Sequence, residues 1–436
     1  MADYGGNDRY PNTFSNKVIQ NLEDIAGKPP IFRVGGSTQH SAVYYPDQVE
    51  AIIEQFDSIS SSQPRHSYIG PAFMQSFQNF PESTKFIFGL NFYNPENETL
   101  FDVGDGILQC VVEANAVYNA IGENLYGFEI GNEDYVDQWN EYAIAISQNL
   151  TGKDSLAIFQ GCVFEAPRNV WSSTAWNFEN AEGDGMRSNK AKSVADHEYM
   201  GAACDYTGVG PTIETTIFDR MNMLKRVWYH DYLGNVTKDS GIPYILGETN
   251  SISCQGAKRI SDVLAAAVWA VDYVLYLSSL RVDRVHFHMG TRYPYASWIP
   301  VTFNDTAPEI KPIYYAALFN AHIFSGGEKQ TEVWSTEQAS EHMPCELESI
   351  VAARLTMWNS TFDEAKRPYT SLELPSSWRN AKVSRPTNPV VGIANNITMA
   401  GQSVNSDGGI AGEKTYESLD NGRVLVGAGE AVIAQH

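Results

Sequence analysis

The sequence predicts an α/β fold, a (β/α)8 TIM barrel followed by a C-terminal β-sandwich domain. From about residue 15 to residue 300, short apolar runs alternate with longer helical patterns, and such repeated βα units build a parallel sheet. After Pro312 the sequence pattern changes to short β-type runs separated by Pro, Gly and Asn turns. We therefore expect the barrel to occupy residues 1–312 and the second domain residues 313–436.

Seven apolar runs have the length and composition of barrel strands. They cover residues 30–36, 85–93, 125–133, 156–164, 193–200, 244–250 and 284–290. A complete barrel needs an eighth strand, which should precede the helix near Asn16. The chain starts where that strand should end, so we expect the first barrel strand to be missing from it.

Helical patterns separate these runs. The first places Val18, Ile19, Leu22 and Ile25 on one face and stops at Gly27, a residue type that commonly ends helices. Others are expected near residues 47–60, 106–121, 136–149, 211–233 and 261–280. The last is apolar enough to suggest a membrane span, but it contains Asp272 and follows a Ser-Asp helix start. We interpret it as a buried helix.

The second domain should begin with one helix over residues 313–324. Its best strand candidates are residues 331–336, 349–358 and 370–374, and the pair of segments that flanks Asp420-Asn421-Gly422. An Asn-Gly pair favours a tight hairpin turn. These short runs indicate the β-sandwich.

The composition excludes several classes of partner. Lys and Arg total 30 against 52 Asp and Glu, which gives a formal charge of -22. Nonspecific attraction to nucleic acid or to an anionic membrane is disfavoured by such a charge, and a highly sulfated polyanion would also fit poorly. Aromatic residues make up 12% of the chain; they can stack on sugar faces or simply fill the core.

Cysteines and glycosylation sequons bear on the compartment. The five cysteines are scattered without a C-x-x-C pair, so neither a zinc site nor a dense disulfide framework is indicated. Six Asn-x-Ser/Thr sequons suit a secreted glycoprotein; they are Asn97, Asn149, Asn235, Asn304, Asn359 and Asn396. The residues after Met1 do not form a signal peptide.

Two of the predicted strands end in a glutamate beside small or amide residues, Gly131-Asn132-Glu133 and Gly247-Glu248-Thr249. In a barrel the carboxyl ends of the strands face the active site. A charge at the end of an apolar strand is costly unless it faces water or a partner, although a single glutamate could also cap the next helix. The pair indicates a two-carboxylate site, as in glycosidases, whose retaining or inverting course depends on the carboxylate separation.

These motifs resemble glycoside hydrolase family 79, the β-glucuronidase and heparanase family of the clan A barrels, and its fungal-like β-glucuronidase branch. The resemblance runs from about Pro11 to the C-terminus. It is carried by Pro11-Asn12-Thr13-Phe14-Ser15, Arg33-Val34-Gly35-Gly36, Gly131-Asn132-Glu133, Gly247-Glu248-Thr249-Asn250-Ser251 and the segment from Arg284 to Tyr295.

The resemblance implies a role for each site residue. Glu133 would be the acid/base, Glu248 the nucleophile and Asn132 a hydrogen-bond partner of the substrate 2-hydroxyl. Tyr199 matches the clan position of a tyrosine that donates to the nucleophile. Tyr293 and Tyr295, with Trp298 nearby, fall where the family shapes the pocket around the sugar carboxylate; a purely structural role for these rings is the alternative.

Two features of the sequence qualify this resemblance. The usual Gly-Gly-Asn-Thr-Gln-Asp reads Gly36-Ser37-Thr38-Gln39-His40 here, and a tyrosine found after the nucleophile in some members is Ser253. One donor to the sugar carboxylate is thereby expected to be absent. His286 and His288 share one side of a strand, but without further ligands we interpret them as hydrogen-bonded interior histidines rather than a metal pair.

The expected function is that of a retaining exo-β-glucuronidase, which would hydrolyse terminal β-linked glucuronic acid, with or without a 4-O-methyl group. The expected partners are a carbohydrate or a small-molecule glucuronide, with no nucleic acid and no membrane, and neither step implies a cofactor or a metal. A heparanase-like endo-β-glucuronidase is one alternative, although we find no basic run for sulfated chains. A non-catalytic carbohydrate-binding relic of the fold is the other.

Overall fold

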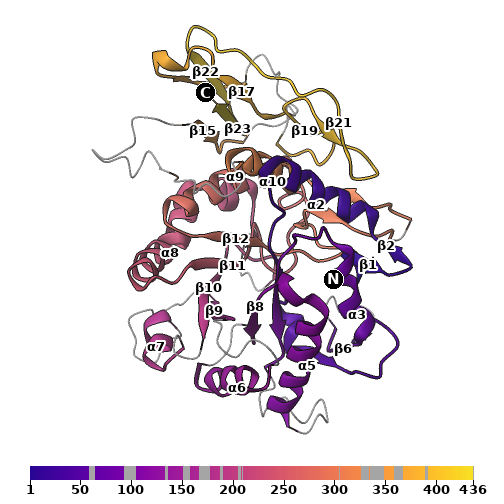
Figure 1. The fold of residues 1–436 in the computed structure, drawn as a ribbon. Coiled ribbons are helices and arrows are strands. Elements are labelled where there is room, and N and C mark those ends of the chain that lie inside the picture. The colour runs from indigo at the N-terminus through magenta and orange to yellow at the C-terminus, as the bar shows by residue number, and fades with distance from the viewer. Residues whose placement is uncertain are drawn as a thin grey trace.

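The computed structural model has a sheet of seven parallel strands at its centre (Figure 1). It describes residues 1–57, 64–92, 105–132, 136–150, 158–165, 177–186, 190–204, 208, 210–303, 305–325, 333, 348–357, 367–387 and 391–435. The strands are β3 Phe32–Val34, β7 Phe86–Leu90, β8 Leu125–Ile130, β9 Phe159–Glu165, β10 Ala191–Tyr199, β11 Tyr244–Asn250 and β12 Arg284–Phe287.

These seven strands are the seven that the sequence predicts, and they lie in chain order from β3 to β12. All neighbouring pairs are parallel, as expected for βα repeats. β3 and β12 each have one neighbour in the sheet among the described residues. The sheet is therefore a near-complete TIM-like barrel that is open between β3 and β12, where the eighth strand was expected.

Helices cover the outside of the sheet. They are α2 Thr13–Ala26, α5 Gly106–Ile121, α6 Val136–Asn149, α7 Phe178–Gly183, α8 Arg220–Ser240, α9 Leu264–Ser279 and α10 Ile313–Ile323. Local chemistry sets the ends of α2: the Asn12 side chain accepts from the Ser15 N–H, and Gly27 closes the helix in the left-handed conformation at φ 83°. Both are the residue types that such positions favour.

One helix prediction is wrong and a second is displaced. Of the helix expected over residues 47–60, the described part, residues 47–57, is not helical, because Ile52–Gln55 is strand β5, which pairs with β6 (His66–Ile69) beside β4 (Ala42–Tyr44). Its β-branched pair Ile52-Ile53 suits an extended strand. The helix expected over residues 211–233 is displaced: a π-helical turn spans Ile213–Ile217, and α8 begins only after Asp219, whose carboxylate caps it.

The apolar stretch at residues 261–280 is the buried helix α9, as predicted, and 10 of its 16 residues are buried. Within the part of the chain that the structure describes, no helix is long and apolar enough to cross a membrane. The remaining short elements of the barrel half are α1 Ala2–Gly5, β1 Gly6–Asn7, β2 Tyr10–Pro11, α3 Pro71–Gln75, β13 Trp298–Ile299 and β14 Glu309–Ile310.

The C-terminal segment forms the expected sandwich, which lies against α9 and α10 (Figure 1). One sheet contains β15 Ser349–Arg354, β23 Glu430–Gln435 and β17 Lys382–Ser384; the other contains β16 Tyr369–Glu373 and β22 Arg423–Gly427. A small core lies between them, made of Leu374, Trp378, Ala381, Val383, Val424, Val426, Val432 and Ala434. Short two-stranded ribbons follow, β18 Pro386–Thr387 with β19 Thr398–Met399, and β20 Ser403–Val404 with β21 Ile410–Ala411.

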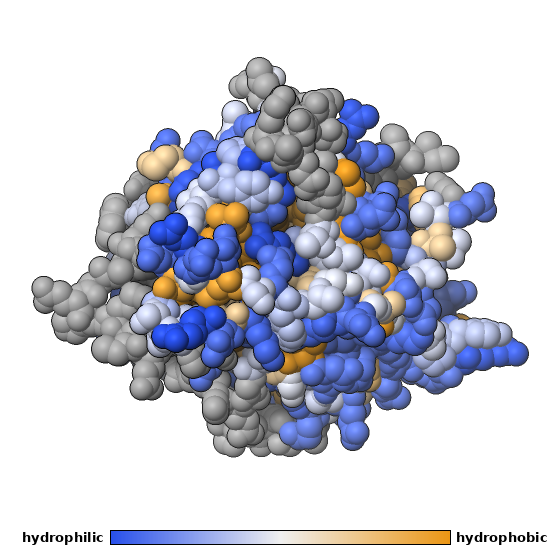
Figure 2. Space-filling view, turned by 90° about the horizontal axis from the view of Figure 1, so that it is seen from above, coloured by the Kyte–Doolittle hydropathy of each residue, from blue (hydrophilic) through white to orange (hydrophobic). Residues whose placement is uncertain are grey.

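In this domain the predicted Asn-Gly turn can be compared with the structure, whereas most of one predicted strand cannot. Asn421 and Gly422 both have positive φ, 52° and 78°, between the bridged residues Asp420 and Arg423, so the tight turn is confirmed. The strand expected at residues 331–336 falls outside the described residues except for Val333. Seen from the side of this domain, the surface is mainly hydrophilic, with apolar groups between the polar ones (Figure 2).

Candidate active site

Glu248 lies near the carboxyl end of β11, where its side chain is almost buried, with 7% of the residue exposed. Three side chains from other strands or loops contact its carboxylate. The Tyr199 hydroxyl donates to Oε1 at 2.7 Å, Arg33 Nη1 donates to Oε2 at 2.6 Å, and His288 Nδ1 lies 3.2 Å from Oε1. Each oxygen thus has a positioned donor, which favours the ionised form.

The electrostatics of the site keep Glu248 ionised. Burial by itself would raise its pKa, but His288, His197 and Arg33 act in the opposite direction and hold the pKa of Glu248 well below its ordinary value. A carboxylate that stays charged down to low pH can act as a nucleophile or as an electrostatic stabiliser, but not as the acid of a proton transfer near neutrality. Its chemistry therefore needs a second group as proton donor.

Arg33, in the middle of β3, connects Glu248 with β8 and with Asn132, which follows that strand. Its guanidinium also donates to Glu129 and, at 2.7 Å, to Asn132 Oδ1. The side chain is 5% exposed, and Glu129 is fully buried and accepts a further hydrogen bond from Gln160 at 2.8 Å. Burial opposes the charge, but the two carboxylates raise the pKa of Arg33, so it remains a cation.

Asn132 is held on both its backbone and its side chain. Its backbone N–H lies 2.9 Å from His40 Nε2, and the preceding Gly131 carbonyl accepts from the buried Gln39 amide at 2.5 Å. Because Asn132 Oδ1 accepts from Arg33, the Nδ2 group of Asn132 points away from Arg33 and can donate to another acceptor. Glu133, the next residue, lies outside the described residues.

Glycines make room for this arrangement. A Cβ atom on Gly35 or Gly89 would lie 2.1 Å from Gln39 Oε1, so both positions exclude a side chain. Gly36 has φ +90°, and a Cβ atom there would lie 3.5 Å from Glu248 Oε2 and 3.3 Å from His288 Nε2. The backbone of the Gly35-Gly36 turn therefore forms a wall directly beside the Glu248 carboxylate.

The two tyrosines predicted after the last strand occupy different positions. Tyr295 is 1% exposed, and its hydroxyl lies 2.9 Å from His288 Nδ1, so it contacts the histidine that faces Glu248. Tyr293 is partly exposed and packs edge-on against both His288 and Tyr295, with ring centroids 5.9 and 5.7 Å apart. Trp298 is 3% exposed and donates to Ser15, in the core rather than beside Glu248.

His286, in β12, and His288, just after it, have different surroundings. His288 belongs to the hydrogen-bonded group around Glu248, because its Nδ1 atom also lies 3.0 Å from the Tyr199 hydroxyl. His286 lies in β12 with only part of its surface exposed, and desolvation, together with Arg284 and Arg33, lowers its pKa to about 3, so it is neutral. Among the described residues, no cluster of three or more His, Cys, Asp or Glu side chains could hold a metal ion.

The sequence did not single out several of these contacts. Arg33 was part of a motif without an assigned role, Gln39 and His40 were named only within a departure from the family motif, and Glu129 and Gln160 were not considered as site residues. A charged residue in the middle of an otherwise apolar strand, as in Phe32-Arg33-Val34, was the available signal. The sequence could not show which carboxylate pairs with Arg33, since Glu129 is 96 positions away.

Comparison with known proteins gives relatives over most of the chain. It is 32% identical over 356 residues to a β-glucuronidase of Aspergillus niger and 32% identical over 349 residues to a β-glucuronidase of Neurospora crassa, matches that include 75% and 72% of this chain. They span 63% and 60% of those relatives. No family model matches the chain.

Solved structures support the fold. A 4-O-α-L-rhamnosyl-β-D-glucuronidase from Fusarium oxysporum 12S aligns with a TM-score of 0.75 at 17% identity, over 100% of this chain and 93% of that one. A family 51 α-L-arabinofuranosidase from Bifidobacterium longum aligns with a TM-score of 0.53 at 12% identity, over 99% of this chain and 92% of the other. At these identities the likeness concerns the architecture alone.

Proposed function

We propose that this chain, which is 32% identical to these fungal β-glucuronidases over most of its length, is a retaining exo-β-glucuronidase of glycoside hydrolase family 79. The substrate would be a terminal β-linked glucuronic acid, with or without a 4-O-methyl group, on a glycan or a small glucuronide. The observation that carries the proposal is the buried, ionised Glu248 at a strand end, held by Tyr199 and Arg33.

Glu248 is the nucleophile in this proposal. Attack on the anomeric carbon requires an unprotonated carboxylate, and the low pKa of Glu248 supplies one. Tyr199 and Arg33 orient one oxygen each, and their hydrogen bonds must weaken as the glycosyl-enzyme bond forms and charge leaves the carboxylate.

Glu133 is the proposed acid/base. It directly follows Asn132 at the end of β8, so it would face the same end of the sheet as Glu248. In a retaining mechanism its proton goes to the leaving oxygen, and the ionised Glu133 then removes a proton from the water that hydrolyses the intermediate. Asn132, whose Oδ1 accepts from Arg33, would direct its Nδ2 group to the substrate 2-hydroxyl.

The sugar carboxylate is assigned to the Tyr293 side of the site. Tyr293 lies close enough to Glu248 for the negative charge to raise its pKa, in addition to burial, so its hydroxyl stays protonated and can donate. The Tyr295 hydroxyl contacts His288, and we therefore propose that Tyr295 positions His288 in addition to binding the substrate. A protonated hydroxyl can hold a uronate despite the net charge of -22, because a short hydrogen bond outweighs a screened distant field.

An extracellular location fits two observations. The sequon asparagines that the structure describes, Asn149, Asn235 and Asn396, are all exposed, as N-glycosylation requires. Cys204 and Cys254 form a disulfide, which persists mainly in oxidising compartments. We propose a secreted glycoprotein on these grounds.

The direct test measures release of aryl alcohol from p-nitrophenyl β-glucuronide, with the β-glucoside and the β-galactoside in parallel. We expect cleavage of the glucuronide alone, and the β-anomer of glucuronic acid as the first product by NMR. Cleavage of a different glycoside would refute the sugar assignment, and the α-anomer as first product would refute retention.

Two substitutions test the roles. Glu248→Gln should lower kcat at least about 1,000-fold with the fold intact by circular dichroism.

Glu133→Ala should lose much less activity on aryl glycosides whose leaving group needs no proton than on alkyl glycosides. Equal losses on both substrate types would remove Glu133 from the role of acid.

A further inference from the structure

Glu129 is a buried carboxylate of the site that has no part in the chemical steps proposed above. It lies on β8 with 0% of its surface exposed. Arg33 donates to Glu129 Oε1 through Nε, at 2.8 Å, and through Nη2, and Gln160 donates to Oε2 at 2.8 Å. A residue without exposed surface does not touch the substrate, so Glu129 can act on the reaction only through its neighbours.

Glu129 belongs to a hydrogen-bonded layer that crosses three strands of the barrel. It stands opposite Gln160 on β9, and Gln160 stands opposite Ser193 on β10. The Ser193 hydroxyl donates to Gln160 Oε1 at 3.3 Å, and Gln160 and Ser193 are 1% and 0% exposed. A Cβ atom on Gly247 would lie 3.6 Å from Gln160 Nε2, so the layer lies against β11, the strand of Glu248. These contacts hold the Glu129 carboxylate in one orientation.

The charges around Arg33 are unequal in number. One guanidinium contacts two carboxylates, Glu129 and Glu248; the Arg33 side chain is 5% exposed, and theirs are 0% and 8% exposed. Both carboxylates raise the pKa of Arg33, and the effect of Glu129 is the larger of the two. A buried cation without an anion is strongly destabilised. Arg33 can therefore tolerate the loss of one carboxylate charge, but not the loss of both.

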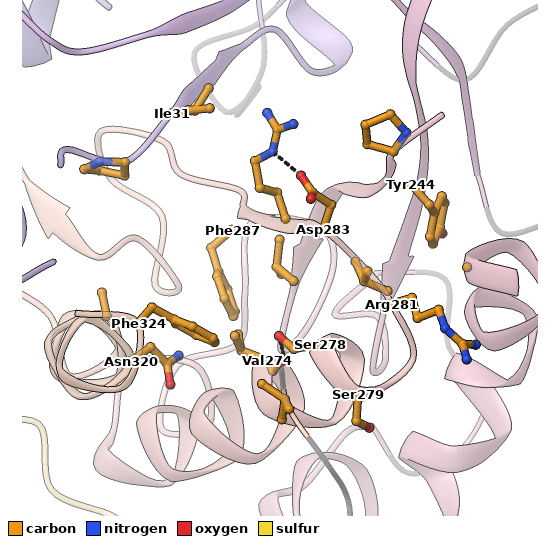
Figure 3. Close-up of a pocket in the computed structure, with 18 of the residues that line it drawn as sticks. Ile31, Tyr244, Val274, Ser278, Ser279, Arg281, Asp283, Phe287, Asn320 and Phe324 are labelled. Carbon is orange, nitrogen blue, oxygen red and sulfur yellow. Dashed lines mark hydrogen bonds and ion pairs between the residues drawn. The ribbon is translucent and has the colours of Figure 1, made fainter. Parts of the chain in front are cut away.

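Arg284, on β12, has a different arrangement. It pairs with Asp283 at 2.8 Å, and its side chain is 22% exposed while that of Asp283 is 51% exposed. Both residues line a cavity of about 1680 Å³, and Figure 3 shows Asp283 there, with the ion pair as a dashed line. Water screens such a pair, so Arg284 does not depend on a second carboxylate. The two carboxylates of Arg33 thus match its burial, and they also match the proposed reaction.

That reaction removes the charge from one of them. When Glu248 attacks, one of its oxygens bonds to the anomeric carbon, the bond from that carbon to the leaving oxygen breaks, and the proton of Glu133 goes to the leaving oxygen. The negative charge thereby passes from Glu248 to Glu133, and residue 248 becomes a neutral ester. When water cleaves the ester, Glu133 takes a proton from the water and Glu248 regains its charge. Between the two steps Arg33 keeps one of its two anions, Glu129.

We propose that Glu129 is a positioning residue, the counter-ion that Arg33 retains while Glu248 is glycosylated. With Glu129 in place, Arg33 stays in an ion pair throughout the cycle and neutralises Glu248 only in part before the attack. Without Glu129, Arg33 would stabilise the free carboxylate of Glu248 much more than the ester. The first half-reaction would then slow, and the second would accelerate. This inference rests on the function proposed above, but the first of its two tests needs no activity.

The first test uses Glu248→Gln, which makes residue 248 neutral as glycosylation does. We compare the Tm of the wild-type chain, Glu248→Gln, Glu129→Gln and the double variant near neutral pH. The double variant leaves Arg33 without either anion, so its Tm should lie at least about 3 °C below the value expected from adding the two single effects. Glu113→Gln combined with Glu248→Gln is the matched control; Glu113 is 1% exposed on another element, and its effect should be additive.

Additive effects of Glu129→Gln and Glu248→Gln would overturn the proposal. A double variant that does not fold, although both single variants do, is the extreme form of the expected coupling. If Glu129→Gln does not fold by itself, the crystal structure of Glu248→Gln decides instead. We expect Arg33 to keep its contacts with Glu129 in that structure, and an Arg33 side chain that has left Glu129 would overturn the proposal.

The second test separates the half-reactions with 2-deoxy-2-fluoro-β-glucuronyl fluoride, a probe that forms a slowly hydrolysed glycosyl-enzyme. In Glu129→Gln the rate constant of trapping should fall at least about tenfold, whereas the rate constant of reactivation should stay equal or rise. Gln160→Met removes one neighbour of Glu129 but keeps the charge, so both constants should change less than about threefold. A purely structural role of Glu129 would slow both half-reactions, and that result would refute the counter-ion role.

The two tests distinguish this inference from the proposed function. A wild-type chain that cleaves no glycoside and does not react with the fluorinated sugar would refute the proposed function itself. Additive Tm effects, or equal slowing of both half-reactions in an active chain, would refute only the role of Glu129.

Discussion

Arg33 is the single buried cation around which the candidate site is organised. It contacts Glu248, Glu129 and Asn132 at once, so it determines both the charge of the nucleophile and the orientation of the neighbouring amide. Breaking a buried ion pair from one side leaves an uncompensated charge, which costs about 3–5 kcal/mol. The stability of the barrel interior and the ionisation of Glu248 therefore depend on the same side chain.

We predict that Arg33→Met destabilises the protein by about 3–5 kcal/mol and shifts the acid limb of the pH–activity profile upward. The low pKa of Glu248 contributes stability above the pKa of the unfolded chain, and this contribution is lost as pH falls through the folded value. Without Arg33 that loss should begin at higher pH. The measurements are urea denaturation and kcat from pH 3 to 8.

Arg284→Met is the matched control, because Arg284 is also partly buried and pairs with Asp283 at the other end of the sheet. It should cost stability without moving the acid limb. An acid limb that stays in place in Arg33→Met would show that Arg33 does not set the ionisation of Glu248.

Glu113 is another buried carboxyl, on α5, outside the group of contacts around Glu248. Burial raises its pKa to about 8, although the Asn91 backbone N–H donates to it. A raised carboxyl pKa means that its contribution to stability is complete below the unfolded value and declines as pH rises to the folded value. Glu113 should therefore make the free energy of unfolding fall between about pH 4.5 and pH 8.

We predict that Glu113→Gln removes part of this decline, on the order of 1.4 kcal/mol for each pH unit. Urea denaturation of both proteins between pH 5 and pH 9 measures it, with the exposed Glu141→Gln as the control. Parallel stability curves for the wild-type chain and Glu113→Gln would contradict the prediction.

At the scale of the elements, the sequence predicted best where one physical requirement determined the pattern. Strands of a parallel sheet are buried on both faces, so their apolar runs were recognisable, and all seven were located. The same requirement made the glutamate at the end of β11 conspicuous. Its hydrogen bonds were beyond the sequence, because Arg33 and Glu248 are 215 positions apart.

The helix predicted near residues 47–60 failed for the opposite reason. Val49, Ile52, Ile53 and Phe56 are spaced like the apolar face of a helix, yet all four are exposed, by 39% to 85%. The pairing of β5 with β6 outweighs that periodicity. A spacing pattern predicts a helix only when the apolar face finds a core to contact.

The disulfide Cys204–Cys254 joins the segments that follow β10 and β11, the strands of Tyr199 and Glu248. We predict that Cys204→Ser with Cys254→Ser lowers the free energy of unfolding by about 4 kcal/mol, as expected for a cross-link separated by 50 residues. Activity of the folded protein should remain within about twofold, since Gly201 and Ser253 stay joined by a backbone hydrogen bond of 2.8 Å.

Chemical denaturation with and without dithiothreitol measures this effect. The reductant should destabilise the wild-type chain and leave the double variant unchanged, because the described free thiols, Cys110 and Cys162, take no part in the cross-link. Equal stability of the oxidised and reduced wild-type chain would refute a contribution of the disulfide.

At the scale of the whole molecule, the two halves share a hydrophobic core. Val391, Ile397, Met399, Ala431 and Ile433 of the C-terminal half belong to the same buried cluster as the barrel helices. The first turn of α9 has no side-chain cap; instead Leu264 and Ala265 donate to the carbonyls of Ile393 and Val391. The C-terminal half therefore completes hydrogen bonds that a helix start must otherwise leave to water.

This dependence predicts how shortened chains behave. A chain that ends at residue 325 keeps α10 but loses the partners of Leu264 and Ala265, and it exposes the apolar face of α9. A chain that ends at residue 312 loses α10 as well, which packs against α2 and α9. We expect the first to be folded only marginally and the second to aggregate, since each exposes a large apolar patch.

Far-ultraviolet circular dichroism and size-exclusion chromatography distinguish these states. A further variant combines the chain that ends at residue 325 with Leu264→Asp, which places a polar side chain in the first turn of α9. It tests whether the missing hydrogen bonds or the missing apolar contacts contribute more to the loss of stability. Partial recovery of Tm would favour the hydrogen bonds, and further loss would favour the apolar contacts, since Leu264 is 1% exposed in the complete chain. A stable, monomeric chain of residues 1–312 would show that the barrel half is independent of everything that follows it.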